Sequence, residues 1–383
     1  MPVYLDCAAT TPVETSVKEV MLRFLERDFG NPASPVHEYG TFARMAVDHA
    51  RGQIARVVGA RRDEVIFTSG ATEANNLALL GLRAAGLSSG RRHIISSVIE
   101  HKSVLEPLAA LTNYGFDLTL IGADDDGRMR VDELAAALRP ETLLVSTMQV
   151  NNETGILQPL AEIAACLAGH DLFWHVDAAQ GFGKEFASLQ HPRIDMISIS
   201  GHKIYGPKGI GALIARKRRG HLPPLQPLMY GGDQEQGLRP GTLAVPLIAG
   251  LGEAARSATR QQQQRFAAVQ AVRARALEAI AALDPLINGD QRFCLPHFVN
   301  FSLPGIPAAA AIEALAGVIA ISSTSACTSH STAPSHVIAA MGRTDREVSS
   351  ALRLAWCHLT EEIDWERVVE ILSQLKSNVA QES

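Results

Sequence analysis

The sequence predicts an α/β fold: a large domain built on a mostly parallel seven-stranded sheet, joined to a smaller α+β domain. Seven short apolar runs recur through the first two-thirds of the chain, each with the length of a buried strand. Helix-compatible stretches separate most of these runs, and such alternation favours a parallel sheet covered on both faces. At roughly 150 residues per domain, 383 residues are also too many for one ordinary domain.

The elements of the large domain follow from hydrophobic spacing. Strands are predicted at 65–68, 93–98, 118–121, 143–148, 173–176, 196–199 and 210–215. Apolar residues three and four apart predict helices at 74–85, 131–138 and 160–167. In such sheets ligands bind at the carboxyl ends of the strands, so the loops that follow the strands are the place to look for chemistry.

The last third of the chain opens with a long Ala-, Gln- and Arg-rich segment, 247–283, whose composition favours helix. Beyond it the pattern predicts strands at 298–303, 318–322 and 352–356, and helices at 308–315 and after Thr360. We therefore expect a large domain over 15–250 and a small domain formed by 1–14 and 251–383.

Composition excludes several function classes. The formal net charge is −5, so the chain as a whole lacks the basic character of a nucleic-acid or membrane-surface protein. The first residues do not read as a secretory signal, and no uncharged apolar run is long enough to span a bilayer. The five cysteines are scattered without metal-type spacing, which favours reduced thiols and a cytoplasmic protein.

The segment FTSGATEANN, 67–76, is the first candidate for chemistry. It follows a predicted strand and enters a helix, so the N–H groups at the helix start and the Thr72 hydroxyl are suited to hold a phosphate. Taken alone, a plain strand-to-helix turn capped by Thr72 is the more common explanation.

Two further segments carry a carboxylate and a lysine. In FWHVDAAQGFGK, 173–184, Asp177 ends an apolar strand, where it either pairs with a cation such as a protonated pyridine nitrogen or caps the next turn. In SISGHKIYGPKGIG, 198–211, Lys203 follows a buried strand among glycines; it is either a solvent-facing loop lysine or an amine whose burial makes it nucleophilic toward an aldehyde. Together the three segments supply what pyridoxal 5′-phosphate requires.

Nine motifs follow one another along the chain: YLDCAATTP, FGNPASPVHEYG, SGATEANN, IEHKSV, VNNETGILQP, HVDAAQ, SGHKIYGPKG, RPGT and SACTS. In this combination and order the sequence resembles the cysteine desulfurases of the NifS/IscS type, which are class V, fold-type I pyridoxal-phosphate enzymes. The resemblance covers essentially the whole chain. It implies a homodimer that uses L-cysteine as substrate and passes sulfur to an acceptor protein, with no direct nucleic-acid or membrane binding.

The resemblance also assigns roles to individual positions. Lys203 would bind the cofactor aldehyde covalently, Asp177 would pair with the pyridine nitrogen, and His101 would stack on the ring and could move the proton that the substrate releases. The phosphate would be bound by Ala71, Thr72, Ser200 and His202, and by Thr242 from the neighbouring subunit. Gln180 would lie near the phenolic oxygen of the ring, and Asn152 and Arg353 would bind the substrate carboxylate. Each role has a purely structural alternative. His101 could be an ordinary histidine at a helix start, and Arg353 could be a residue of an edge strand whose aliphatic side-chain carbons pack against its neighbours.

Cys327 distinguishes the reaction within the family. It lies in ISSTSACTSHSTAPS, a segment of Ser, Thr, Ala and His in which a thiol could move between cofactor and acceptor. By resemblance, Cys327 takes the sulfur of L-cysteine as a persulfide and alanine is released; the acceptor would serve iron–sulfur assembly, tRNA thiolation or DNA phosphorothioation. Alternatives are a selenocysteine lyase, a cysteine-sulfinate desulfurase or a non-catalytic interaction protein. We expect no metal.

Two positions depart from the family pattern. Cys7 stands where LDNAATTP has Asn, and Cys357 replaces a usual Gly in ALRLAWC. Neither position has a catalytic role in the resemblance. The HEYG form of the early motif and the short tail suit a specialised member, such as the desulfurase of DNA phosphorothioation.

Overall fold

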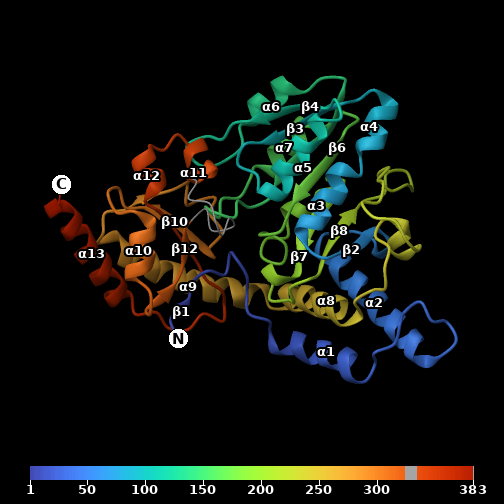
Figure 1. The fold of residues 1–383 in the computed structure, drawn as a ribbon, viewed down its shortest axis with the longest axis horizontal. Helices are drawn as coiled ribbons and strands as arrows, with labels where there is room; N and C mark the ends of the chain where they lie inside the picture. Colours follow the sequence, from blue (N-terminus) through green and yellow to red (C-terminus); the bar gives the residue numbers. More distant parts are fainter. Residues whose placement is uncertain (324–333, 383) are drawn as a thin grey trace.

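The computed structural model describes residues 1–323 and 334–382 (Figure 1). Its largest sheet has seven strands in the order β2-β8-β7-β6-β5-β3-β4. The strands are β2 Val65–Thr68, β3 His93–Ser97, β4 Asp117–Ile121, β5 Thr142–Met148, β6 Phe173–Asp177, β7 Met196–Ser200 and β8 Gly211–Ala215. Only β8 runs antiparallel to its neighbours, so the mostly parallel seven-stranded sheet is confirmed.

Both faces of this sheet are buried because alternate apolar residues point to opposite sides. Phe67 and Ile199 join one core with Trp174, while Ile66 and Met196 join another. The first face is covered by α1 Thr15–Glu26, α2 Glu38–Val57, α6 Val131–Ala137, α7 Leu160–Cys166 and α8 Val245–Arg260. The second is covered by α3 Ala71–Leu80 and α5 Lys102–Thr112, and α4 Arg83–Ser89 lies at its margin, where Gly86 approaches Phe116. The helix predicted at 74–85 is thus two helices.

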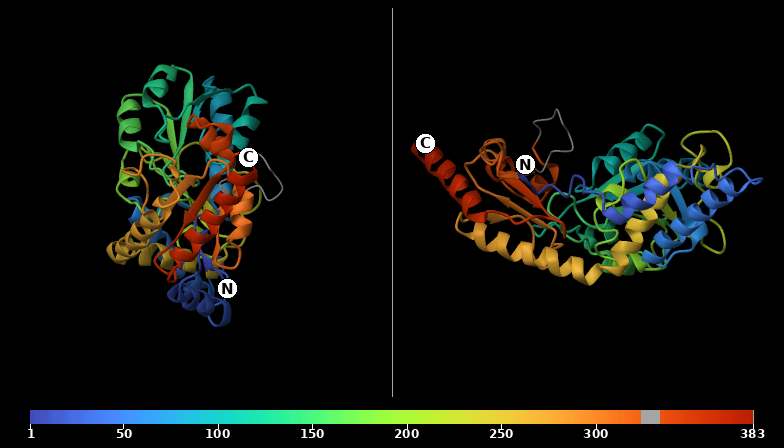
Figure 2. Two further views of the ribbon diagram at one scale, coloured as in Figure 1. Left: turned by 90° about the vertical axis from the view of Figure 1, so that its left-hand side faces the viewer. Right: turned by 90° about the horizontal axis from the view of Figure 1, so that it is seen from below.

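The Ala- and Gln-rich segment forms two helices, α8 and α9 Gln262–Ala281. They meet at Gln261, whose φ of −109° and ψ of 12° interrupt the helix. In Figure 2 this pair runs along the molecule, with α8 under the large sheet and α9 under the second one. The segment therefore joins the two cores, as expected of a connector, although its break was not predicted.

A second, antiparallel sheet has the order β12-β13-β10-β9 and a separate core. Its strands are β9 Leu286–Ile287, β10 Phe298–Ser302, β12 Ser322–Ser323 and β13 Ala351–Ala355, and β1 Val3–Tyr4 pairs in parallel with β11 Ile319–Ala320 beside it. The helices are α10 Ala308–Ala314, α11 His336–Ala340, α12 Asp345–Ser349 and α13 Trp365–Glu382. The strand predicted at 318–322 is divided between β11 and β12, and the helix expected after Thr360 begins only at Trp365. The domain limits given above stay a prediction.

Within the described residues, no helix combines the length and hydrophobicity needed to cross a membrane.

Candidate functional site

A cavity of about 500 Å³ opens where β5, β6 and β7 end, beside the second sheet. This volume is within the usual range for small-molecule sites. Ten of the residues singled out from the sequence line it: Ala71, Thr72, His101, Asn152, Asp177, Gln180, Ser200, His202, Lys203 and Arg353. The folded chain therefore gathers predicted residues that are up to 282 positions apart around one space.

Lys203 ends a short 3₁₀ helix, Gly201–Lys203, that follows β7 directly. Its Nζ donates hydrogen bonds to the carbonyl oxygens of Ala8 and Ala9, the latter at 2.9 Å. The turn after it is strained, because Tyr205 has a φ of 67°, in the left-handed region. Tyr205 N donates to Thr11 Oγ1 at 2.8 Å, which fixes the turn against the N-terminal segment. The N-terminal segment thus holds both the amine and the turn that follows it.

Asp177 is the last residue of β6 and only 6% exposed. Its Oδ1 accepts a hydrogen bond from Ala179 N at 2.9 Å, and its Oδ2 accepts one from Asn75 Nδ2 at 2.8 Å. A carboxylate has about four acceptor positions, so these two bonds leave capacity for a further donor in the cavity. The site fits a cationic ring nitrogen.

A chain of hydrogen bonds joins Asp177 to His101. Asn75 Nδ2 also donates to Ser103 Oγ at 2.9 Å, and Ser103 Oγ lies 2.8 Å from His101 Nδ1. Since His101 Nδ1 also accepts from Ser103 N at 3.1 Å, the neutral ring carries its proton on Nε2. The geometry thus sets both the orientation and the tautomer of His101.

The phosphate candidates lie around the start of α3. Its N-cap is Gly70, so no side chain caps the first turn and its N–H groups can meet an anion. Ser200 and His202 line the same cavity from the end of β7. Burial, with Lys203 and Lys208 nearby, lowers the pKa of His202 to about 4, so this ring is neutral and can donate one N–H.

Glycine is required where β8 begins. A Cβ on Gly211 would lie 2.4 Å from the carbonyl oxygen of Ile199 and 2.7 Å from Gly70 Cα. The absent side chain at position 211 therefore lets β8 pass close behind the loop that begins α3.

Arg353 lies on β13 of the second sheet and is 2% exposed. Its guanidinium donates to Asn152 O at 2.9 Å and to Asp6 Oδ1 at 2.7 Å. Among the described residues, none accepts a hydrogen bond from its buried Nε. A buried donor without a partner is costly, so this nitrogen is suited to a ligand carboxylate.

Sequence reasoning missed three residues of this site: Asn75, Ser103 and Asp6. All three stand inside motifs quoted above, SGATEANN, IEHKSV and YLDC, which was the available signal. Two further predicted residues have different outcomes. Thr242 is exposed and does not line the cavity of its own chain, and Cys327 lies outside the described residues.

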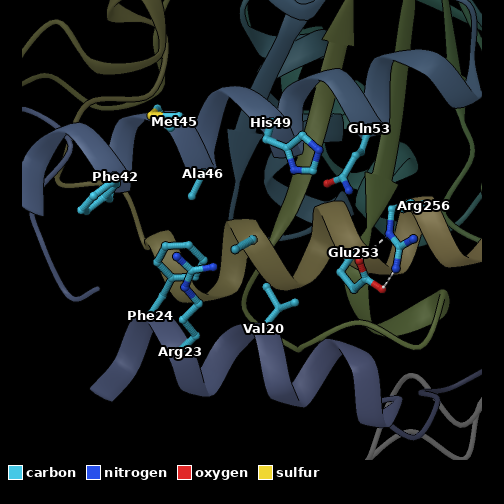
Figure 3. A pocket seen from close by; sticks show the side chains of 11 residues that line it. Val20, Arg23, Phe24, Phe42, Met45, Ala46, His49, Gln53, Glu253 and Arg256 are labelled. Carbon is cyan, nitrogen blue, oxygen red and sulfur yellow. Dashed lines mark hydrogen bonds and ion pairs between the residues drawn. The ribbon is translucent and has the colours of Figure 1, made fainter. Parts of the chain in front are cut away.

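A second cavity, of about 330 Å³, lies between α1, α2 and α8 (Figure 3). Its charged groups include Glu253 and Arg256, which pair with each other at 2.6 Å, and much of the remaining wall is apolar, including Phe24, Phe42 and Met45. Because the paired charges offer little to a substrate, we assign the chemistry to the first cavity.

Comparison with known proteins agrees with this geometry. The model of the aminotransferase class-V family matches residues 3–367. The cysteine desulfurase IscS of Klebsiella pneumoniae is 42% identical over 95% of this chain and 91% of its own length. The crystal structure of DndA from Streptomyces lividans has a TM-score of 0.81 and 47% identity, covering 92% of this chain and 99% of that one. A structure described as SspA in complex with cysteine has a TM-score of 0.79 and 35% identity, and the match covers 94% of this chain and 100% of that one. The chain therefore belongs to the aminotransferase class-V family and, within it, to the cysteine desulfurases.

Proposed function

We propose that this cysteine desulfurase converts L-cysteine to L-alanine with pyridoxal 5′-phosphate held at Lys203, and carries the sulfur as a persulfide on Cys327. One observation carries the proposal: a lysine, a buried carboxylate, an oriented imidazole and a buried guanidinium line the same cavity. These are the groups needed to bind an aldehyde cofactor and an amino acid side by side.

The cofactor, when bound, supplies an electron sink for the substrate carbon. Its phosphate would be held at the α3 N-terminus by Ala71 and Thr72 with Ser200 and His202, and its ring by Asp177, Gln180 and His101. Asp177 would place negative charge beside the ring nitrogen, and Asn75 holds this carboxylate in position.

For the substrate, Arg353 Nε and Asn152 would bind the carboxylate of L-cysteine. Lys203 Nζ would take the proton of the substrate Cα, and His101 Nε2 would hold a proton at the cavity wall. The Cys327 thiolate attacks the substrate sulfur. An S–S bond forms, the C–S bond breaks, and its electron pair with a proton completes the methyl group of alanine.

The proposal includes a homodimer in which Thr242 reaches the phosphate of the neighbouring subunit. Thr242 is exposed, as this role requires. Large apolar side chains are also exposed on α1 and α2: Leu22, Leu25, Phe42 and Met45. Phe42 and Met45 line the second cavity (Figure 3). Such a cluster favours contact with another protein surface. Sedimentation of the purified protein tests it, and a fully active monomer would contradict it.

We further propose a cytoplasmic location and a protein acceptor for the sulfur. The described cysteines form no disulfide, which supports a reducing compartment. The similarity to DndA favours the DNA-phosphorothioation route among the three acceptor pathways. Incubation with labelled L-cysteine and candidate acceptor proteins tests which one receives sulfur.

The decisive experiment replaces the cysteine. Cys327→Ser is expected to abolish alanine formation from L-cysteine while the visible absorbance of the bound cofactor stays unchanged. Cys166→Ser, at a partly buried cysteine of α7, is the matched control and should retain full turnover. Undiminished turnover in Cys327→Ser would reject the sulfur-carrier role, and absence of visible absorbance after reconstitution of the wild type would reject the cofactor.

A further inference from the structure

Two cysteines from opposite ends of the chain meet in the interior. Cys7 and Cys357 are 4% and 2% exposed and form one buried cluster with Tyr205. The backbone holds them together, because Asp6 pairs in parallel with Ala355 and Cys7 N donates to Ala355 O at 2.9 Å. Each cysteine is the largest cause of the other's pKa shift. These are also the two positions at which the sequence departs from the family pattern, so both departures lie in one contact.

The surroundings make the two thiols unequal. The hydrogen bond from Cys7 lowers the pKa of Cys357 against the opposing effect of burial, and hydrogen bonds from Leu359 N–H and Thr360 Oγ1 act in the same direction. The interaction with Cys357, together with burial, raises the pKa of Cys7. Lys184 lies nearby, and burial lowers its pKa to about 8 while the two cysteines oppose that shift. Cys357 is therefore the better nucleophile, and Cys7 is placed as its resolving partner.

The two cysteines adjoin two structures that hold Lys203 in place, the Ala8 carbonyl and the turn at Tyr205. Cys7 precedes Ala8, whose carbonyl oxygen accepts hydrogen bonds from Lys203 Nζ and, at 2.9 Å, from Gln180 Nε2. Tyr205, the third member of the cluster, forms the strained turn two residues after Lys203. A disulfide requires a narrow range of Cβ separation and torsion, so any adjustment that closes this pair acts on residues next to these supports.

We propose that Cys7 and Cys357 are a redox modification site. A peroxide oxidises the two thiols to a disulfide, and the disulfide weakens the contacts that hold Lys203. The Cys357 thiolate attacks the peroxide, so an S–O bond forms, the O–O bond breaks and hydroxide leaves. The Cys7 thiol then attacks the resulting sulfenic acid, an S–S bond forms and water leaves. Two thiols are oxidised and one peroxide is reduced to two waters. Local opening of the segment after Cys357 admits the oxidant. The effect on cofactor binding rests on the proposed function, whereas the disulfide does not.

The test uses the full-length, cofactor-loaded protein with Cys327→Ser, which removes the other reactive thiol. The protein is treated with hydrogen peroxide, alkylated and digested without reductant. The peptide map should then contain the Cys7 and Cys357 peptides joined together, with a mass two hydrogens below the sum of the two thiol peptides. Dithiothreitol should separate them. The linked pair should be lost in Cys7→Ser and in Cys357→Gly, the latter of which restores the usual family residue. Oxidation of Cys166 shows that the peroxide treatment was effective. If Cys7 and Cys357 are then still recovered as separate alkylated thiols, the proposal is overturned.

A second measurement follows the effect on the cofactor. Oxidised protein should lose its visible absorbance on gel filtration, while the Cys357→Gly variant treated in the same way should keep it. If oxidised protein with the proven disulfide keeps its cofactor as well as reduced protein, the link to Lys203 is wrong. If untreated protein has no visible absorbance, the proposed function fails instead, and the peptide map still decides the disulfide.

Discussion

Glu153 makes the stability of this protein depend on pH. This residue is 4% exposed, and its carboxylate accepts a hydrogen bond from Ser335 Oγ, the N-cap of α11. Burial raises its pKa from 4.5 to about 7, in spite of the opposing effects of Ser335 and Arg353. A difference of that size corresponds to about 3 kcal/mol between the two protonation states.

The direction follows from the raised pKa. The neutral form is favoured in the folded protein, so this contribution to stability is fully present below the unfolded pKa of 4.5 and is lost as the pH rises through about 7. Glu153→Gln keeps an oxygen for Ser335 and cannot ionise. The free energy of unfolding of the variant, relative to wild type, should therefore rise by up to about 3 kcal/mol between about pH 5 and pH 8.

Urea unfolding of both proteins over this pH range measures the difference. Other groups titrate in the same range, and the subtraction of wild type from variant removes their contribution. Glu366→Gln, at an exposed carboxylate on α13, is the control and should change little. A Glu153→Gln difference that stays constant with pH would refute the reasoning.

Three further changes test the site. Arg353→Lys keeps the charge but loses the planar fork, so KM for L-cysteine should rise roughly ten- to hundredfold, while a KM like that of wild type would remove Arg353 from substrate binding. Asn75→Ala leaves Asp177 and Ser103 without a shared donor and should lower the free energy of unfolding by about 2 kcal/mol in urea; no loss would show that these bonds contribute little. Gly211→Ala places a Cβ against Ile199 and Gly70 and should cost about 1 to 3 kcal/mol and weaken cofactor retention on gel filtration, and unchanged retention would show that the loop before α3 can move.

The seven strands of the large sheet were predicted within one residue of their observed ends because both faces are covered, and burial on both faces leaves a plain apolar run in the sequence. Asp177, Ser200 and Lys203 could be expected at the site because each follows such a run. Their neighbours could not be found in this way. Asn75 and Ser103 lie on helices, where a buried polar residue has the same pattern as an exposed one.

Contacts that join distant segments left even less signal. Asp6 and Arg353 form their ion pair across 347 positions, and Cys7 meets Cys357 across a similar separation. The break between α8 and α9 falls at a glutamine, with no proline or glycine to mark it. Such features follow from how the two cores are placed against each other, which local propensity does not encode.

The N-terminal strand has a consequence for biosynthesis. Val3 pairs with Ile319 and Asp6 with Ala355, while Ala8 and Ala9 hold the lysine amine. Residues 3–9 therefore cannot take their final positions until residues 319 and 355 have been made. Closing so long a loop is slow, so the large sheet can fold earlier during translation, but the catalytic pocket matures only after residue 355 has been made.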